Sequence, residues 1–159
     1  MLNWIKFITA FLLTLTIVIV TSLFYRAHKP VEEANAWASK AALQSNQVVS
    51  VNSTQLYNGT ESLVVVFGTN DKGEEVAVFV DEPAAESFQE VNLAKGITDK
   101  QAIGVVQKEH KVKKVLHASL GIEEDEPVWE VAFQGSDDKL NYVYLFFESG
   151  QWSKRILNL

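Results

Sequence analysis

Near the N-terminus the sequence contains an apolar run, Phe7–Tyr25, in which no residue carries a charge. An α-helix needs about 20 apolar residues to cross the hydrocarbon core of a bilayer, so this run is long enough to span one. Its threonines and serine can return hydrogen bonds to backbone carbonyls one turn earlier. Trp4 and Tyr25 flank the run, where amphipathic aromatic side chains prefer the membrane interface. The pattern predicts one membrane-spanning helix near the N-terminus.

A cleaved signal peptide is the alternative interpretation of the same run. It would need a shorter apolar region, about 7–15 residues, followed by a pair of small residues at a cleavage site. From the end of the run onward the residues are Tyr25, Arg26 and Ala27, which supply no such pair, and this favours a retained anchor. The nearby basic residues are nearly balanced, with Lys6 on one side and Arg26 and Lys29 on the other. Charge alone therefore leaves the orientation of the helix open.

Beyond the anchor, the spacing of apolar residues predicts a helix and then a group of strands. Pro30 precedes a helix at Val31–Asn46, which has two acids in its first turn and an alanine-rich stripe at helical spacing. Runs rich in β-branched residues then alternate with turn signals such as Asn58-Gly59. Strands are predicted at Gln47–Tyr57, Leu63–Thr69 and Glu75–Asp81, and Ser87–Leu93 is either a fourth strand or a helical turn.

The same order repeats in the second part of the chain. Thr98 and Gln101 form a Thr-x-x-Gln capping box, which predicts a helix that begins at Thr98 and ends near His110 or Lys111. Alternation of apolar and polar residues then predicts further strands, at Lys114–Leu120, Val128–Gln134, Leu140–Glu148 and Gln151–Asn158. In the first of these strands we expect Leu116 to face the same way as Ala118 and Leu120, and in the second we expect Glu130 to face outward.

Charge and cysteine content narrow the classes of partner and chemistry. All 20 acids follow Lys29, whereas three of the 14 bases lie at or before it, which leaves a net charge of −9 for residues 30–159. So acidic a region argues against nucleic acid and against anionic lipid headgroups as partners. The chain has no cysteine, which excludes disulfides, thiol catalysis and thiolate metal sites.

These elements predict an α+β fold in which one transmembrane helix precedes two domains, each a helix packed on an antiparallel sheet. The predicted divisions are residues 1–29 for the anchor, 30–96 for the first domain and 97–159 for the second. A domain of roughly 65 residues buries only about 60% of its unfolded surface and is marginal alone. We therefore expect the two halves to pack together, or to continue each other's sheet, instead of swinging on a linker.

Several segments of the second half resemble a PepSY domain, a small module with one helix and an antiparallel sheet. The resemblance rests on Ile97–Ala102 (ITDKQA), Val128–Val131 (VWEV), Tyr142–Phe147 (YVYLFF) and Ser149–Gln151 (SGQ). In its order of parts, anchor included, the whole chain is similar to the TseB-like (YpmB-like) cell wall elongation regulators of Gram-positive bacteria.

The family resemblance implies tandem cystatin-like domains outside the cell, tethered by a helix whose N-terminus lies inside. It also implies a partner, a membrane-bound penicillin-binding transpeptidase of cell elongation, and it supplies no catalytic residues and no cofactor. An alternative follows from the PepSY resemblance, because such modules also occur in propeptides: the chain binds or inhibits a secreted or membrane peptidase. A third hypothesis is that the chain is an enzyme. For this hypothesis the sequence offers no nucleophile–base pair, metal cluster or phosphate loop.

The candidate contact residues lie in the strand predicted at Leu140–Glu148. Tyr142, Tyr144 and Phe146 alternate with residues that face the helix of their own half, so the three aromatic side chains face away from that helix. Such a stripe is typical of a partner surface. The alternative is that the first half of the chain covers it, which would make it an interdomain surface.

The acidic run and the histidines of the second half can each be interpreted as a metal site or as ordinary structural residues. A cation loop at Glu123–Glu126 would need the spaced oxygens and glycine of calcium loops, which the run lacks, so we interpret it as a solvated acidic turn. His110 and His117 have no convergent partners at a recognisable spacing. We therefore interpret them as core or surface residues.

Overall fold

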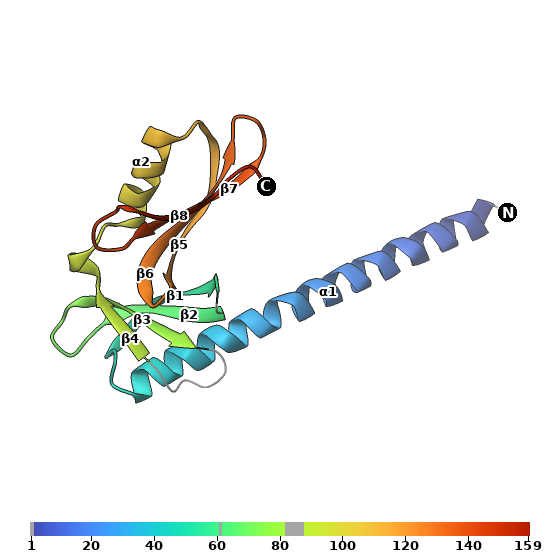
Figure 1. Cartoon of the computed structure of the whole chain (residues 1–159). Coiled ribbons are helices and arrows are strands. Elements are labelled where there is room, and N and C mark those ends of the chain that lie inside the picture. Colours follow the sequence, from blue (N-terminus) through green and yellow to red (C-terminus); the bar gives the residue numbers. More distant parts are fainter. Residues whose placement is uncertain (1, 61, 82–87) are drawn as a thin grey trace. The chain divides into compact units, whose positions relative to one another are not determined.

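The computed structural model describes residues 2–60, 62–81 and 88–159. It is an α+β fold with a long N-terminal helix and two antiparallel four-stranded sheets (Figure 1). The chain forms two compact units that divide between Ala34 and Asn35. The first unit is helical, and the second holds the end of the same helix and both sheets.

Helix α1 runs from Leu2 to Gln44 without a break, and Pro30 lies inside it. The prediction of a separate helix beginning after Pro30 is therefore wrong. A proline removes one backbone hydrogen bond, but a helix that is already nucleated gains one bond per residue on either side. Lys29 and Glu33 form an ion pair of 3.4 Å across the proline, an arrangement of i and i+4 that adds a little stability.

The apolar part of α1 has the properties expected of a membrane span. Trp4 and Tyr25 are each 72% exposed, and the apolar side chains of Phe7–Tyr25 are exposed between them. Thr9 and Thr14, among other hydroxyls, donate to carbonyls four residues earlier at 2.9 Å. By length and composition this helix is able to cross a membrane. A signal sequence near an N-terminus satisfies the same criterion.

The first sheet has the strand order β1-β2-β3-β4, in which all neighbours are antiparallel. Its strands are β1 (Ser50–Asn58), β2 (Ser62–Thr69), β3 (Glu75–Asp81) and β4 (Phe88–Asn92), followed by the short 3-10 helix η1 (Leu93–Lys95). The ambiguous stretch Ser87–Leu93 thus supplies a strand and the start of a helical turn, with Ser87 itself outside the described residues.

The second sheet has the order β5-β6-β7-β8 and carries helix α2 (Asp99–Glu109). Its strands are β5 (Val112–Glu123), β6 (Glu126–Gly135), β7 (Leu140–Phe146) and β8 (Trp152–Ile156). The capping box is confirmed, because the Thr98 hydroxyl accepts from the Gln101 N–H while the Gln101 side chain accepts from the Thr98 N–H. It fixes the start of α2 one residue after Thr98.

A β-bulge corrects the predicted face of Leu116. Strand β5 shifts register between Val115 and His117, so the extra residue, Leu116, leaves the alternation. Leu116 is 47% exposed, whereas Val115 and Ala118 pack against the core.

Both faces of the central strands β2 and β3 of the first sheet are buried, and the second sheet contributes to the burial of one of them. Ala38 and Ala42, in the turns of α1 that belong to the second unit, are fully buried, as are valines 76, 78 and 80 of β3. The other face of β3, with Ala77 and Phe79, belongs to a core cluster that includes residues of both sheets and of α2. The two halves therefore pack together as two separate sheets around a shared core. The division predicted at Gly96 stays a prediction.

Candidate partner surface and the junction of the sheets

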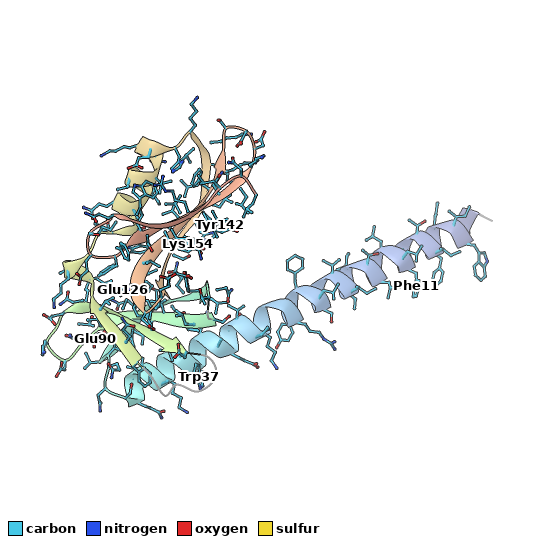
Figure 2. The ribbon with its side chains drawn as sticks, in the orientation of Figure 1. Phe11, Trp37, Glu90, Glu126, Tyr142 and Lys154 are labelled. Carbon is cyan, nitrogen blue, oxygen red and sulfur yellow. The ribbon has the colours of Figure 1, made fainter. Side chains whose placement is uncertain are left out.

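The second sheet has one face toward α2 and an opposite face, here called the open face. Strand register aligns polar side chains on it, with Glu130 opposite Tyr144 and Ser119, and Tyr144 opposite Lys154. His117 lies on the same face two residues before Ser119. The open face is thus a row of titratable and hydroxyl side chains drawn from all four strands. Figure 2 labels Tyr142 and Lys154 among them.

The three aromatic residues predicted from the sequence alternate with core residues as expected. Val143 and Leu145 belong to the core cluster together with Ala102 and Val106 of α2. On the open face Tyr144 is 6% exposed. Tyr142 and Phe146 are half-buried. Only the latter two present much surface to a partner.

Glu130 is the polar centre of the open face. It is directed outward from α2 as predicted, but it is only 7% exposed, so it does not lie in solvent. The His117 Nε2 atom lies 3.0 Å from Glu130 Oε1. Burial raises the pKa of Tyr144 far above its usual range, and a hydrogen bond with Glu130 raises it further. Lys154 Nζ lies over the Tyr144 ring at 5.5 Å from its centre.

A hollow of about 510 Å³ lies over this face. It is lined by His117, Glu130, Tyr142 and Tyr144 of the second sheet and by Leu56 and Tyr57 of β1, among others. Aromatic rings beside hydrogen-bonding groups are typical of surfaces that hold the side chains of a partner.

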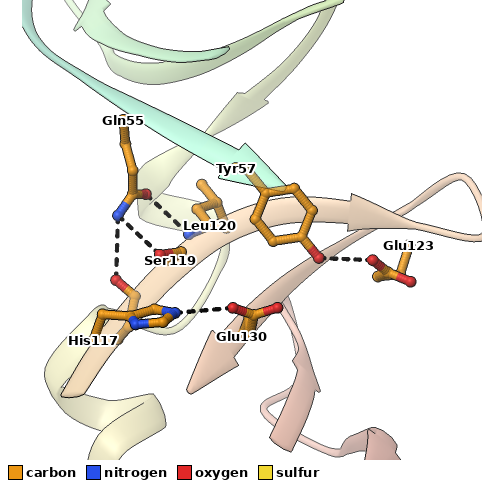
Figure 3. A network of polar contacts seen from close by, with 8 residues as sticks. Gln55, Tyr57, His117, Ser119, Leu120, Glu123 and Glu130 are labelled. Carbon is orange, nitrogen blue, oxygen red and sulfur yellow. Dashed lines mark hydrogen bonds and ion pairs between the residues drawn. The ribbon is translucent and has the colours of Figure 1, made fainter. Parts of the chain in front are cut away.

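Gln55 links the edge strands of the two sheets, β1 and β5 (Figure 3). Its Nε2 donates to the Ala118 carbonyl and to the Ser119 hydroxyl, each at 3.3 Å. Its Oε1 accepts from the Leu120 N–H at 3.1 Å. One side-chain amide thus takes the place of a neighbouring strand and satisfies the edge of β5 at this point.

Glu123 forms the second link and corrects the prediction of a solvated acidic turn. It is 6% exposed and accepts from the Tyr57 hydroxyl at 2.8 Å. It also accepts from the Thr60 N–H and hydroxyl, at 3.1 and 2.9 Å, and Lys154 lies 3.9 Å away. Only the following Glu124 and Asp125, both at positive φ, form the exposed turn between β5 and β6.

The pKa of Glu123 reflects this environment. Burial acts to raise it, but hydrogen bonds from Tyr57 and Thr60 and the charge of Lys154 together outweigh burial, so the pKa lies below its ordinary value. Burial and the bond to Glu123 raise the pKa of Tyr57 far above its usual range. Glu123 is therefore a buried carboxylate that holds its charge at neutral pH.

Two glycines make room for the Tyr57 ring at the junction of the sheets, where Gln55 and Tyr57 of β1 bond to residues of β5. A Cβ on Gly121 would lie 2.3 Å from the ring, and a Cβ on Gly59 would lie 2.4 Å from the ring and 2.2 Å from Glu123 Oε1. All three distances are too short for any real contact. The junction thus depends on Tyr57 and Glu123, which are 66 positions apart in sequence. The spacing of the strands in the sequence does not indicate that these two residues meet.

The remaining predicted polar sites have structural roles in the described residues. Within residues 2–60, 62–81 and 88–159, no group of three or more His, Asp or Glu side chains is placed to hold a metal ion. The His110 ring lies 5.5 Å from that of Phe133 and 5.6 Å from that of Trp152. It is part of the packing around the end of α2.

Comparisons with known proteins agree with the predicted resemblance. A family model described as the cell wall elongation regulator TseB-like domain matches residues 38–81. The chain is 24% identical over 143 residues, 89% of each chain, to a protein of Bacillus subtilis strain 168 named "Probable cell wall elongation regulator TseB". A solved structure, the YpmB protein from Bacillus subtilis, matches with a TM-score of 0.67 and 25% identity, over 78% of this chain and 94% of that one.

Proposed function

From its similarity to the TseB-like cell wall elongation regulators, we propose that this chain is a membrane-anchored, non-enzymatic regulator or adaptor of cell wall elongation. The sheets lie on the extracytoplasmic side and act by contact with a penicillin-binding transpeptidase. One observation carries the proposal: α1 supplies both the apolar run and the buried residues Ala38 and Ala42 of the second unit, Asn35–Leu159, which we call the body. A segment with both roles ties the proposed anchor directly to the part of the chain that carries the contact surface.

The environment of the buried carboxylates also supports a contact role over a catalytic one. Glu130 is engaged with His117 and Tyr144, and Glu123 is engaged with Tyr57 and Thr60. A general base is kept free to meet substrate, whereas these groups hold strands and sheets together. The open face then offers Tyr142 and Phe146 as contact residues.

A retained anchor predicts that the full-length chain is found in the membrane. Cell fractionation followed by intact-mass measurement is expected to place the uncleaved chain in the membrane pellet, because an apolar helix of this length partitions into lipid. Release into the medium of a species shortened near Tyr25 would show instead that the run is a signal peptide.

The contact role predicts site-specific crosslinking in cells. A photo-crosslinking amino acid at Tyr142 or Phe146 is expected to link the chain to a membrane transpeptidase, because both side chains are partly accessible on the open face. The matched control is the same amino acid at Lys108, an exposed position on α2, which should give no such link. Recovery of peptidases alone from Tyr142 would favour the PepSY-type inhibitor and contradict the proposal.

A further inference from the structure

A second and larger hollow lies on another side of the body. This groove, of about 820 Å³, runs between β1, the start of β3, η1 and the first turn of α2. Its floor includes Phe67, Leu93, Ile97 and Trp129, which come from separate segments of the chain. The groove is thus a product of the packed fold, and no run of the sequence indicates it.

The floor of the groove is held in place by hydrogen bonds. Trp129 Nε1 donates to the Ile97 carbonyl at 2.8 Å. The Ile97 N–H in turn donates to the Phe147 carbonyl at 2.8 Å. Trp129 is 7% exposed and belongs to the core cluster. A preformed apolar floor of this kind binds without the cost of ordering its own side chains.

The rim of the groove is acidic. Glu74, Glu75 and Asp99 line it and are exposed. Among the described residues that line it there is neither lysine nor arginine. Glu74 is oriented by Asn70, whose Nδ2 donates to it at 3.0 Å. The charge of the groove therefore complements a basic ligand, and it matches the acidic balance of residues 30–159.

One wall of the groove is the edge of a sheet. Ser53 and Thr54 of β1 line it, and in the strand order of the described residues β1 has a neighbour on one side only, β2. An edge strand can pair with an added extended segment, and alternate side chains of that segment then enter neighbouring pockets. Gln55, the next residue of β1, is bonded to the edge of β5, so Ser53 and Thr54 are the part of the β1 edge that we offer to an added segment.

We propose that this groove binds an extended, basic segment of the protein that the chain regulates, with lysine or arginine side chains toward the acidic rim and an apolar side chain on the Trp129 floor. The inference rests on the proposed function for the identity of the protein that supplies the segment. It adds the chemistry and the conformation of that segment. The occupant pairs along Ser53 and Thr54 as an added strand.

The test uses the full-length chain in nanodiscs of zwitterionic lipid and a fluorescent peptide of about eight alternating lysines and valines, within the usual range of strand lengths. Fluorescence anisotropy is expected to show binding to loaded nanodiscs and none to empty ones. Replacing the rim charges, in the variant Glu74→Gln, Glu75→Gln, Asp99→Asn, should weaken binding at least about tenfold, since each lost charge removes part of the attraction. Ala94→Trp, a change at an exposed residue of the lining, should abolish binding by filling the groove.

The matched control removes three charges elsewhere, two from the exposed turn between β5 and β6 and one from the exposed first residue of β6. The variant Glu124→Gln, Asp125→Asn, Glu126→Gln is expected to change binding less than about twofold, because these residues lie outside the lining. Absence of binding to the wild-type chain, equal binding of a glutamate–valine peptide, or equal loss in both triple variants would overturn the proposal. Self-association that Ala94→Trp removes would overturn it too and assign the groove to a second copy. If the peptide fails while Tyr142 still crosslinks to a transpeptidase, the groove is refuted and the proposed function stands.

Discussion

Replacing Glu123 with alanine is expected to lower the free energy of unfolding by about 3 kcal/mol, because the change removes the charged acceptor of several hydrogen bonds and leaves their donors unpaired. Tyr57 and Thr60 would lose their acceptor inside the junction of the sheets. For a body of this size the loss corresponds to a melting temperature lower by about 10 °C. Near-ultraviolet circular dichroism of the full chain in detergent micelles measures it, since that signal reports the packing of aromatic rings.

The control for this prediction is Glu126→Ala, three residues away and exposed, which should change the stability by less than about 0.5 kcal/mol. The pH dependence gives a further check. The folded-state pKa of Glu123 is lowered, so its contribution is fully present above the unfolded value of about 4.3 and is lost as the pH falls through the folded value. The stability difference between wild type and Glu123→Gln should therefore shrink on acidification below about pH 4. A difference that stays constant or grows on acidification would contradict the assigned network.

Local features of the fold could be predicted well from the sequence. The bounds of β3 are those predicted, Glu75–Asp81, because a short apolar run lies between strong turn signals. The capping box at Thr98 fixed the start of α2, since its partner is only three residues away. The apolar run at Phe7–Tyr25, which is able to cross a membrane, is evident from length and composition alone. Each of these features depends on residues that are close in sequence.

Features that depend on tertiary context could not be predicted in the same way. The bulge that turns Leu116 outward appears only when β5 is aligned with β6. The burial of Glu123 depends on Tyr57 and Thr60, which lie in the other half of the chain. In the sequence Glu123 begins an acidic run, and a run of acids is normally solvated.

The candidate surface also has some features that follow from local sequence and others that depend on tertiary context. Alternation in β7 was enough to place Tyr142 and Phe146 on the open face, because a strand turns successive side chains to opposite sides. It could not show that Tyr144 is covered, since Lys154 and Glu130 reach it from neighbouring strands. The acidic groove was not predicted at all, because its lining comes from segments that only the packing of the sheets brings together.

The Gly121→Ala variant should destabilise the body by about 3 kcal/mol, the upper part of the range for an overpacked core. The new Cβ would lie 2.3 Å from the Tyr57 ring. That ring cannot move aside freely, because it is 1% exposed and its hydroxyl is bonded to Glu123. Thermal unfolding of the full chain in micelles measures the loss, and the junction between the sheets is expected to open first.

Gly104→Ala provides the matched control, since a Cβ at that position of α2 meets nothing within 4 Å. It should raise stability by up to about 1 kcal/mol, because alanine is the better helix former. A double-mutant cycle then identifies the cause. If the clash with Tyr57 is responsible, Gly121→Ala should cost little in a Tyr57→Leu background, which gives a coupling of about 2 kcal/mol between the two sites. Additive losses would mean that Gly121 is needed for the backbone of β5 itself, and that the Tyr57 ring is not what fixes one sheet against the other.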